Sequence, residues 1–463
     1  MQRMSELSIA LNRFGLGARG GDPLPHEVRG DLLAQLDRYD PAPPPIAALP
    51  GSGAMLAAYA SARRDRREQR MARDEQGSEP AVKKIKGVGG RMRAHLLDAS
   101  GARLASATGT QAPFPERLVH FWANHFAVST DKVPVIALAG PFESEAIRPH
   151  ATGRFADLLR AAVTHPAMLL YLDQARSLGP ESPLGVRVRE RAKRERGLNE
   201  NLAREVLELH TLGVGGGYTQ GDVVELAKAL TGWTVAGIGR RGADREPGAR
   251  FAAHMHEPGT RTILGKRYAE TGAAQLDAVL ADLARHPATA RHVATKLARH
   301  FAGNPPPPAL VDALAERFLD TDGDLPSIYR TLVERPEPWA APPMFRSPWD
   351  WLVGAARAID YRPPNPRLGY RLTVELGQPV WEPKSPAGYA DTSATWTGSD
   401  ALMRRIEAAE RIAASAREAD PRALAPRLFP DTASEATLQA IARAESQQQG
   451  LALLFASPEM MRR

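Results

Sequence analysis

The most informative stretch of the chain, residues 199–213, reads Asn-Glu-Asn-Leu-Ala-Arg-Glu-Val-Leu-Glu-Leu-His-Thr-Leu-Gly. Its leucines and its valine recur every three or four residues, as on one face of an α-helix. The polar residues fall on another face, and the closing Gly213 is typical of the position after a helix end. This separation of faces predicts an amphipathic helix over 200–212 that packs its apolar side into a core.

The same helical spacing continues in both directions along the chain. Helical patterns cover 5–40, 55–105, 115–126, 147–163, 167–172 and 220–230, and they resume from residue 273 onward. No region shows the sustained alternation of a strand-rich sheet, and no internal repeat is visible. We therefore expect an all-α, large multi-helical globular protein with long irregular loops, among them 181–196 and 363–396, and little or no β-structure.

Composition divides this helical chain into four segments. Residues 1–50 form an N-terminal helical segment that ends in a proline-rich connector. Residues 51–105 form an Arg-rich peripheral helical excursion, expected to be a solvated helix or, alternatively, an electropositive arm for an anionic partner. Residues 106–360 form a helical core domain that carries most of the motifs, and 361–463 form a loop plus C-terminal helices packed on that core.

Charge and composition exclude several classes of protein. The 463 residues contain 43% hydrophobic and 24% charged side chains, which is too apolar for a disordered chain. The chain has no cysteine, which excludes disulfides, thiolate nucleophiles, zinc fingers and iron–sulfur clusters. The formal net charge of +7 is small for this length, so we do not expect a nucleic-acid partner.

The sequence shows neither an export signal nor a transmembrane segment. The N-terminal residues MQRMSELSIALNRFGLG lack the apolar region and the small-residue cleavage site of a signal peptide. No apolar run approaches the ~20 residues that span a bilayer. The expected location is therefore the cytoplasm by default.

Two carboxylates, Glu205 and Glu208, lie one turn apart on the polar face of the helix predicted over 200–212, with Asn201 one turn before them. Such a pair can share a proton, bind a cation or hold an arginine. Arg204 forms an i, i+4 pair with Glu200 on the same helix. The alternative is a solvated face with salt bridges that performs no chemistry.

The histidine spacing matches no ready-made metal motif. Glu208 and His210 are two residues apart, and His120 and His125 are five apart, so each pair diverges on a helix. Neither pair matches the i, i+3 or i, i+4 arrangement of helical di-metal or His-Glu-x-x-His sites. A divalent metal would need ligands from several helices, and the candidate ligands are Glu205, Glu208 and His256.

A second polar stripe lies on the helix predicted over 115–126. Arg117, His120 and Asn124 share one side of it at i, i+3 and i+7, whereas His125 falls on the apolar side. We expect His125 to be a hydrogen-bonded core histidine, with a role as ligand or proton carrier as the alternative. Trp233 is expected in the core or in the wall of a pocket.

Several longer motifs give the chain a family resemblance. They are residues 117–126 (RLVHFWANHF), 165–173 (HPAMLLYLD) and 199–213, followed by 217–223 (GYTQGDV) and 230–233 (LTGW). Together with 11–17 (LNRFGLG), 256–259 (HEPG), 263–265 (ILG) and 377–379 (GQP), they closely resemble the bacterial domain-of-unknown-function 1800 family over essentially the whole chain. The chain departs from the usual family pattern at Gln174 and over 383–389 (PKSPAGY).

The resemblance implies a mainly helical protein without an established activity. Many members carry export signals and are encoded beside a sulfatase-like family, which implies a sulfatase-like companion protein as partner. The polar residues of the motifs imply a buried site for acid–base work or a cation, or a network that only locks helix packing. The candidate substrate or network residues are Arg117, Asn124, Asp173, Asn199, Asn201, Asp222 and Trp233.

Two functions are open at this point. In the first, the chain is an enzyme or an enzyme subunit, and Glu205 and Glu208 are its acid–base or metal-binding carboxylates. His120 or His125 then carries the proton, and Arg204 or Arg117 contacts an anion. In the second, the chain is a non-catalytic scaffold or assembly partner whose polar network is structural.

Overall fold

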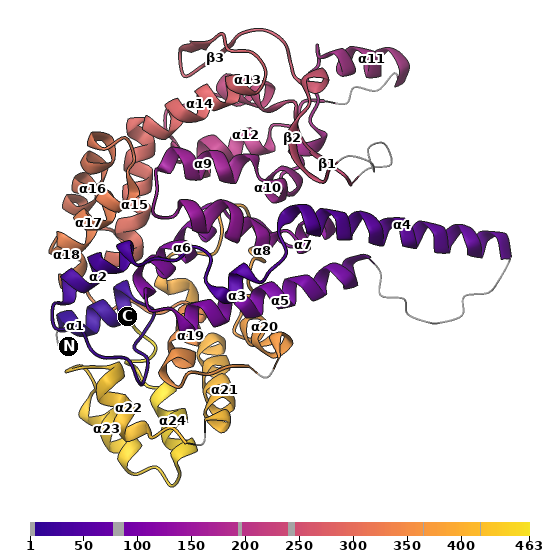
Figure 1. The fold of residues 1–463 in the computed structure, drawn as a ribbon. Coiled ribbons are helices and arrows are strands. Elements are labelled where there is room, and N and C mark those ends of the chain that lie inside the picture. Colours follow the sequence, from indigo (N-terminus) through magenta and orange to yellow (C-terminus); the bar gives the residue numbers. More distant parts are fainter. Residues whose placement is uncertain (1–4, 77–87, 193–196, 239–245, 364, 417) are drawn as a thin grey trace.

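The computed structural model describes residues 5–76, 88–192, 197–238, 246–363, 365–416 and 418–463. Helices account for most of these residues, and the strands form only two short hairpins (Figure 1). The all-α prediction is therefore confirmed. None of the helices in the described ranges is long and apolar enough to cross a membrane.

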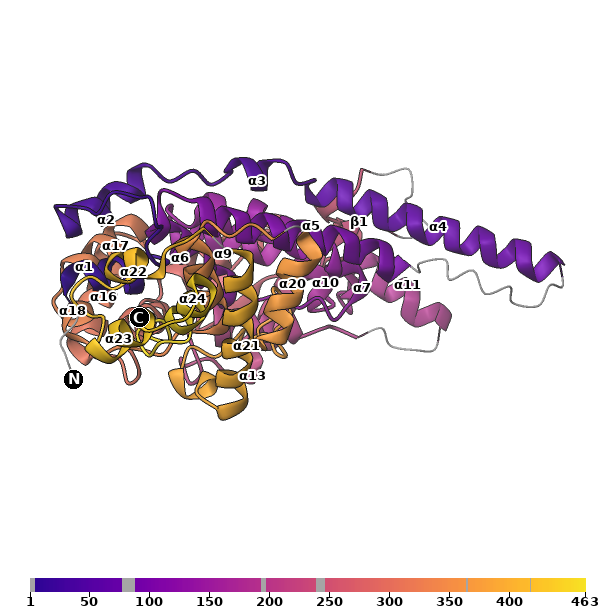
Figure 2. The ribbon, with the colours of Figure 1, turned by 90° about the horizontal axis from the view of Figure 1, so that it is seen from below.

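The N-terminal part begins with short helices and continues into a helical arm. The arm consists of α4 and α5, which lie side by side, and α4 extends beyond the body of the molecule (Figures 1 and 2). Residues 77–87 of the excursion predicted over 51–105 lie outside the described residues. The elements of this part are α1 (Glu6–Ile9), η1 (Ala10–Phe14), α2 (Val28–Asp37), α3 (Pro44–Ala47), α4 (Ser52–Gln76) and α5 (Val88–Gly109).

The central part starts with α6, which lies in the middle of the molecule between α9 and α19 (Figure 1). Pro113 opens α6 and Phe126 follows its last residue. The elements up to the first hairpin are α6 (Pro113–His125), α7 (Val133–Ile136), α8 (Ala139–Phe142), η2 (Glu143–Ile147), η3 (Arg148–His150), α9 (Phe155–Thr164), α10 (Pro166–Tyr171), η4 (Gln174–Arg176), α11 (Pro183–Ala192), α12 (Asn201–Glu205), η5 (Val206–His210) and α13 (Gln220–Leu230).

Two antiparallel hairpins follow α13. In the first, β1 (Trp233–Ala236) pairs with β2 (Gly248–Phe251), so that Trp233 lies opposite Phe251. In the second, β3 (Arg261–Ile263) pairs with β4 (Lys266–Tyr268). The 3-10 turn η6 (Ala253–Met255) lies between the hairpins. Each sheet has two strands, so neither provides a layer of its own.

The remaining helices complete the body of the molecule. The helices α15 and α16 pack against each other, and α21 to α24 form the C-terminal end of the fold (Figure 1). These elements are α14 (Ala273–Arg285), α15 (Pro287–Ala302), α16 (Pro308–Asp320), α17 (Leu325–Glu334), α18 (Glu337–Ala340), α19 (Pro348–Ala358), α20 (Pro366–Glu375), η7 (Ser393–Trp396), α21 (Ser399–Ser415), α22 (Pro421–Leu428), α23 (Glu435–Ala442) and α24 (Gln447–Phe455).

Two predicted loops contain helices, and capping explains both. In the stretch 181–196, of which 193–196 lie outside the described residues, the Ser182 hydroxyl accepts a hydrogen bond from the Gly185 N–H at 3.1 Å and starts α11. In the stretch 363–396, the Asn365 side chain accepts from the Leu368 N–H at 3.0 Å and starts α20. Each cap is followed directly by proline, whose fixed φ suits the first helical position.

The helix predicted over 200–212 is not regular throughout. It begins as α12 and changes at Val206 to the wider π-helical turn η5, which ends at His210. The Thr211 hydroxyl donates to the Val206 carbonyl at 2.6 Å and closes this turn. The apolar spacing of the sequence does not distinguish such a turn from regular α-helix, because single π-helical turns occur within α-helices.

One hydrophobic cluster extends from Ile9 to Met461. At one point of this cluster, Phe14 contacts three aromatic rings, with centroid distances of 5.7 Å to Phe114, 5.3 Å to Phe301 and 4.8 Å to Trp339. These rings come from α6, α15 and α18. The N-terminal segment is therefore part of the same core as the central helices.

We predict that Phe14→Ala lowers the free energy of unfolding by about 3–5 kcal/mol, the usual cost of removing a buried phenyl ring. Urea denaturation followed by circular dichroism measures this change. Val374→Ala, at an exposed apolar side chain of α20, serves as the control and should change stability by less than about 0.5 kcal/mol. Equal effects of the two variants would contradict the placement of Phe14 in the shared core.

Candidate functional site

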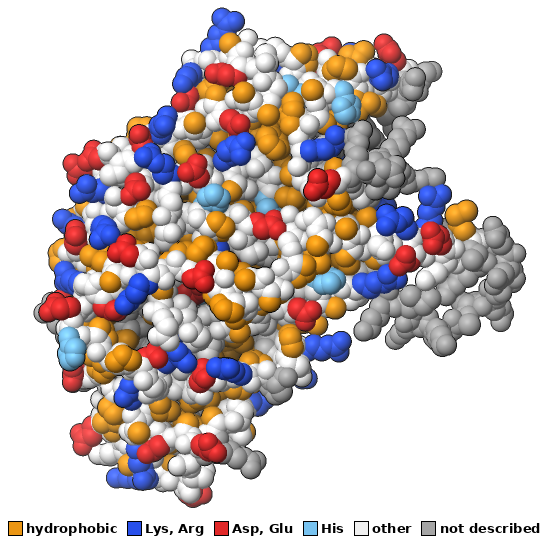
Figure 3. Space-filling view, in the orientation of Figure 1, with side chains coloured by type: hydrophobic (Ala, Val, Ile, Leu, Met, Phe, Trp, Pro, Cys, Tyr) orange, Lys and Arg blue, Asp and Glu red, His pale blue; other side chains and the backbone are white. Residues whose placement is uncertain are grey.

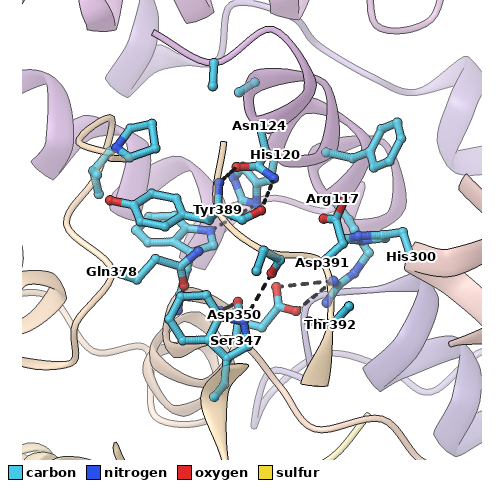
Figure 4. Close-up of a pocket in the computed structure, with 18 of the residues that line it drawn as sticks. Arg117, His120, Asn124, His300, Ser347, Asp350, Gln378, Tyr389, Asp391 and Thr392 are labelled. Carbon is cyan, nitrogen blue, oxygen red and sulfur yellow. Dashed lines mark hydrogen bonds and ion pairs between the residues drawn. The ribbon is translucent and has the colours of Figure 1, made fainter. Parts of the chain in front are cut away.

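A cavity of about 120 Å³ lies beside α6 (Figure 4). Six parts of the chain that are far apart in the sequence line it: α5 through Arg103, α6 with the residues that follow it, the end of α15, residues 344–350, residues 378–396, and Arg463. Its charged and hydrogen-bonding side chains include Arg103, Arg117, His120, Asn124, His300, Ser347, Asp350, Gln378, Asp391, Thr392, Ser393 and Arg463. Its aromatic side chains are Phe121, Phe345, Trp349, Trp381, Tyr389 and Trp396.

The polar stripe predicted on α6 faces this cavity. Arg117, His120 and Asn124 all line it, as their i, i+3 and i+7 spacing on one helix allows. The next residue, His125, points the other way and is 1% exposed. Helical geometry thus brings three of the predicted site residues together and turns a fourth away from them.

Arg117 shares a carboxylate with Arg463. The Arg117 Nη1 lies 3.1 Å and the Arg463 Nη1 3.3 Å from Asp350 Oδ2. Burial alone would raise the pKa of Asp350, but the two guanidinium groups more than offset this and hold that pKa well below its usual range. Asp350 is therefore ionised at neutral pH.

His300 lies next to this group and is neutral. The Arg463 Nη1 donates to the Nε2 of His300, 3.3 Å away. Burial, and then the positive charge of Arg463, lower the pKa of His300 well below its ordinary value. In Figure 4, His300, Arg117 and Asp391 lie on the same side of the cavity.

His120 is hydrogen-bonded within the protein through one of its ring nitrogens. Its Nδ1 accepts a hydrogen bond from the Trp349 indole N–H at 3.1 Å, and its Nε2 faces Glu116 Oε1 at 3.6 Å. Burial and then the charge of Arg103 lower the pKa of His120. In this arrangement the ring is neutral and orients the indole of Trp349 in the cavity wall.

A chain of buried ion pairs connects α6 to η2, η3 and α5. Arg148 donates to both oxygens of Glu116, at 2.6 and 2.9 Å, and lies 3.4 Å from Glu143 Oε1. Arg103 closes the chain with a 2.7 Å contact to Glu143 Oε2. None of these four residues is among the site residues predicted from the sequence. The available signal was Glu116 itself, a second charged residue directly beside Arg117 on the same helix.

Residues 378–396 cover the cavity and attach to α6 through Asn124. The Asn124 amide donates to the Tyr389 carbonyl at 2.9 Å and accepts from the Tyr389 N–H at 2.7 Å. Gly388, with φ of +80°, lies so close that a Cβ there would collide with the Asn124 carbonyl oxygen. This covering segment includes residues 383–389, where the sequence departs from the family pattern.

Asp391 brings a carboxylate from the covering segment to the cavity. It is partly buried, and among the described residues no hydrogen bond or ion pair engages its oxygens. Its negative charge raises the pKa of Lys296 on α15, although burial lowers that pKa overall. Asp391 is not among the site residues predicted from the sequence, since no motif surrounds it.

The predicted residues of α12 and η5 lie outside this cavity. Arg204 is 3.3 Å from Glu200 and donates to Gln220 at 2.8 Å, whereas Glu208 accepts from the Tyr218 hydroxyl at 3.2 Å. Burial, and then the charge of Glu208, raise the pKa of Glu205. Asn201, at the start of this polar face, is exposed. These residues form a partly solvated polar face.

His125 belongs to a separate group of three buried or half-buried histidines. Its ring lies 6.2 Å from that of His210 and 6.0 Å from that of His292, centre to centre. The His125 Nε2 donates to the His210 carbonyl at 3.1 Å, and the His292 Nε2 to the Leu209 carbonyl at 3.0 Å. His125 is thus a hydrogen-bonded core histidine in the structure.

The remaining predicted residues support local structure. The Asn199 amide donates to the Leu172 carbonyl at 3.3 Å, and Asp222 accepts at 2.7 Å both from Thr219 N–H and from Leu264 N–H. Asp173, with φ of +59°, forms a 2.6 Å ion pair with Lys132. Trp233 packs against Phe251.

The metal-ligand candidates do not converge. His256 is buried beside the first hairpin, where its Nδ1 lies 2.8 Å from the Thr231 carbonyl oxygen. Within the described ranges, no three His, Asp or Glu side chains form a group that could hold a metal ion. Glu205, Glu208 and His256 therefore do not share one site in this structure.

The fold and the cavity define a helical protein with a polar, partly aromatic pocket beside a central helix. Comparison with known families gives its relationship: the chain belongs to the family described as protein of unknown function (DUF1800), whose model matches residues 9–462. No curated protein matches the chain. No solved structure matches it either.

We predict that the buried histidines make the fold sensitive to acid. Burial lowers the pKa of His210 to about 3 and that of His292 to about 4, whereas both rise to about 6.5 on unfolding. Between these values the unfolded chain binds more protons, so the free energy of unfolding falls as the pH drops from 6.5 toward 4. Urea denaturation at pH 7, 6 and 5 measures the slope.

The variant His210→Gln should reduce this slope by up to about 1.4 kcal/mol per pH unit, the contribution of one proton. His26→Gln, at an exposed histidine, is the matched control and should leave the slope unchanged. An identical pH dependence of His210→Gln and the wild type would refute the burial of a neutral His210.

We predict that Glu208→Gln lowers the pKa of Glu205, because it removes the second negative charge beside that carboxylate. Carbon-13 NMR titration of the glutamate carboxyl groups measures the pKa, and Glu200→Gln is the matched control. Elemental analysis gives the contradicting outcome. If the purified wild type holds a stoichiometric metal that Glu205→Gln/Glu208→Gln lacks, the two carboxylates are a cation site rather than an uncompensated pair.

Proposed function

We propose that the chain is an enzyme or an enzyme subunit whose active site is the cavity beside α6. The observation that supports this most strongly is the convergence of charged, hydrogen-bonding and aromatic groups from six separate parts of the chain on one pocket. Pockets with a few convergent polar groups among apolar walls are the usual sites for small molecules. In this proposal the substrate is a small polar molecule that enters beneath the covering segment 378–396.

Asp391 is the acid–base residue in this proposal. A carboxylate that lines a pocket without an internal partner can take or give a proton at a bound substrate. Asp350 is unsuited to that role, because Arg117 and Arg463 hold it ionised. His120 acts as a positioning residue, since both of its ring nitrogens face protein groups.

The proposal reassigns some of the roles expected from the sequence. The proton transfer expected of Glu205, Glu208 and His125 passes to Asp391, since none of the three lines the cavity. Arg117 keeps its role as an anion contact, whereas Arg204 lies outside the pocket. Metal assistance stays a prediction, and the elemental analysis of the Glu205/Glu208 variant tests it.

The alternative function is a scaffold or assembly partner for a sulfatase-like companion protein. It has its own support in the buried chain from Glu116 to Arg103, because ion pairs of that kind can serve fold specificity alone. On the face shown in Figure 3, charged groups of both signs are interspersed with scattered apolar atoms. The cytoplasmic location and the absence of a nucleic-acid partner also stay predictions.

The test of the enzyme proposal compares Asp391→Asn with the wild type on a complex substrate pool. Each protein is incubated with a small-molecule extract of bacterial cells, and the compounds are quantified by mass spectrometry over time. We expect compounds that the wild type consumes and that Asp391→Asn consumes about 10²–10⁴-fold more slowly, the usual contribution of an acid–base group.

Asp400→Asn is the matched control, since that carboxylate is exposed on α21 and outside the cavity. It should consume the same compounds at the wild-type rate. Circular dichroism verifies that both variants are folded. If the wild type consumes no compound, or if Asp391→Asn is as active as the wild type, the enzyme proposal is wrong and the scaffold becomes the favoured function.

A further inference from the structure

We propose that the ligand of the cavity is an organic anion, with a carboxylate or phosphate group bound by Arg463 and Arg117 and with a hydroxyl-bearing remainder facing Asp391. The inference rests on the proposed function, because it assigns a substrate class to the same pocket. It is carried by the distribution of charge around Asp350, at one end of the cavity.

Positive side chains outnumber negative ones at this end of the cavity. Five guanidinium groups lie close enough to act electrostatically on one another or on Asp350. They belong to Arg13, Arg117, Arg346, Arg405 and Arg463, which are all buried. Only one carboxylate side chain, that of Asp350, is hydrogen-bonded or ion-paired with any of them among the described residues.

Most of the hydrogen bonds of the arginines behind Asp350 go to backbone oxygens. The Arg405 Nη2 donates to the Arg346 carbonyl at 2.8 Å, and the Arg346 Nε donates to the Arg462 carbonyl at 3.0 Å. Arg13 donates to the Pro342 carbonyl at 2.8 Å. Carbonyl groups orient a guanidinium group but leave its full charge uncompensated, and an uncompensated buried charge is costly.

Two arginines of this group reach the cavity, and they are the ones that an entering anion would meet. Arg117 and Arg463 line it together with His300, whereas Arg13, Arg346 and Arg405 do not. Burial lowers the pKa of Arg463 to about 9, so this guanidinium is still cationic at pH 7. Arg463 Nε has no hydrogen-bond partner among the described residues.

The third arginine of the lining has a different role. Arg103 is ion-paired with Glu143 and stacks over the Trp349 ring, 4.3 Å from its centroid. Its charge is thus compensated, and together with Trp349 and Trp381 it forms one wall of the cavity. This wall can contact the carbon skeleton of a ligand, whose charged group then lies toward Arg463.

Asp391 limits the rest of the ligand. Its carboxylate repels a second anionic group but accepts a hydrogen bond from a hydroxyl. The cavity therefore favours a ligand with one anionic group and a separate group that donates hydrogen bonds. Small hydroxycarboxylates and hydroxyl-bearing phosphate esters share this chemistry.

The test measures binding of defined anions to the full chain by isothermal titration calorimetry at constant ionic strength. The probes are gluconate and glycerol phosphate, with acetate and inorganic phosphate as fragments and chloride as the reference anion. We expect saturable binding of one hydroxyl-bearing probe per chain, tighter than its fragment. Arg463→Gln should weaken that binding by about tenfold or more, as the loss of a charged contact of about 1.4 kcal/mol predicts.

Arg291→Gln, at an exposed arginine of α15, is the matched control and should bind as the wild type does. If Arg463→Gln does not fold, Asp391→Asn provides a second test of the anion inference. We expect the fragments acetate and phosphate to bind Asp391→Asn at least as tightly as the wild type, because a like charge has been removed.

The binding experiment tests the anion inference, and the consumption experiment tests the enzyme proposal, so the failure of one can be distinguished from the failure of the other. The anion inference is overturned if neither hydroxyl-bearing probe binds saturably, or if Arg463→Gln is folded and binds the probes like the wild type. This holds even if Asp391→Asn abolishes the consumption of some other compound. Saturable binding that depends on Arg463 supports the inference even where no compound is consumed, and the enzyme proposal alone then fails.

Discussion

Two consecutive charged residues on α6 hold this central helix in one position and one rotation. Glu116 and Arg117 are both buried and pair with different partners, Glu116 with Arg148 and Arg117 with Asp350. Breaking a buried pair costs about 3–5 kcal/mol, because it leaves a charge without compensation. The helix can therefore neither rotate nor slide without breaking at least one pair, and the direction of each of its other side chains follows.

The cavity and its contents depend on this fixed rotation of α6. It directs His120 toward Trp349 and Asn124 toward Tyr389, so the wall and the covering segment are both attached to one helix. The same rotation turns His125 away from the cavity and into the histidine group. Rigid support of this kind is what a binding site needs, because loosely held groups lose the geometry that recognition requires.

Part of this site could be predicted from the sequence. The spacing of Arg117, His120 and Asn124 indicates one stripe on one helix, since the helical period is a local property. Their partners could not be predicted, because Asp350 and Arg463 follow α6 by more than two hundred residues and no local pattern joins them. Asp391 could not be predicted for a similar reason. It is a single aspartate in an irregular segment, where no periodic pattern marks it, and only the path of the chain brings it to the cavity.

The sequence by itself determined the helical class, most of the helices and the family, because apolar periodicity and long motifs are written in consecutive residues. Only the tertiary structure decided which of two similar polar stripes faces a cavity. The stripe with Glu205 and Glu208 looked as promising as that of α6, but it lies partly in solvent, whereas that of α6 is enclosed by distant segments. Burial depends on what packs against a helix, and that information lies outside the helix itself.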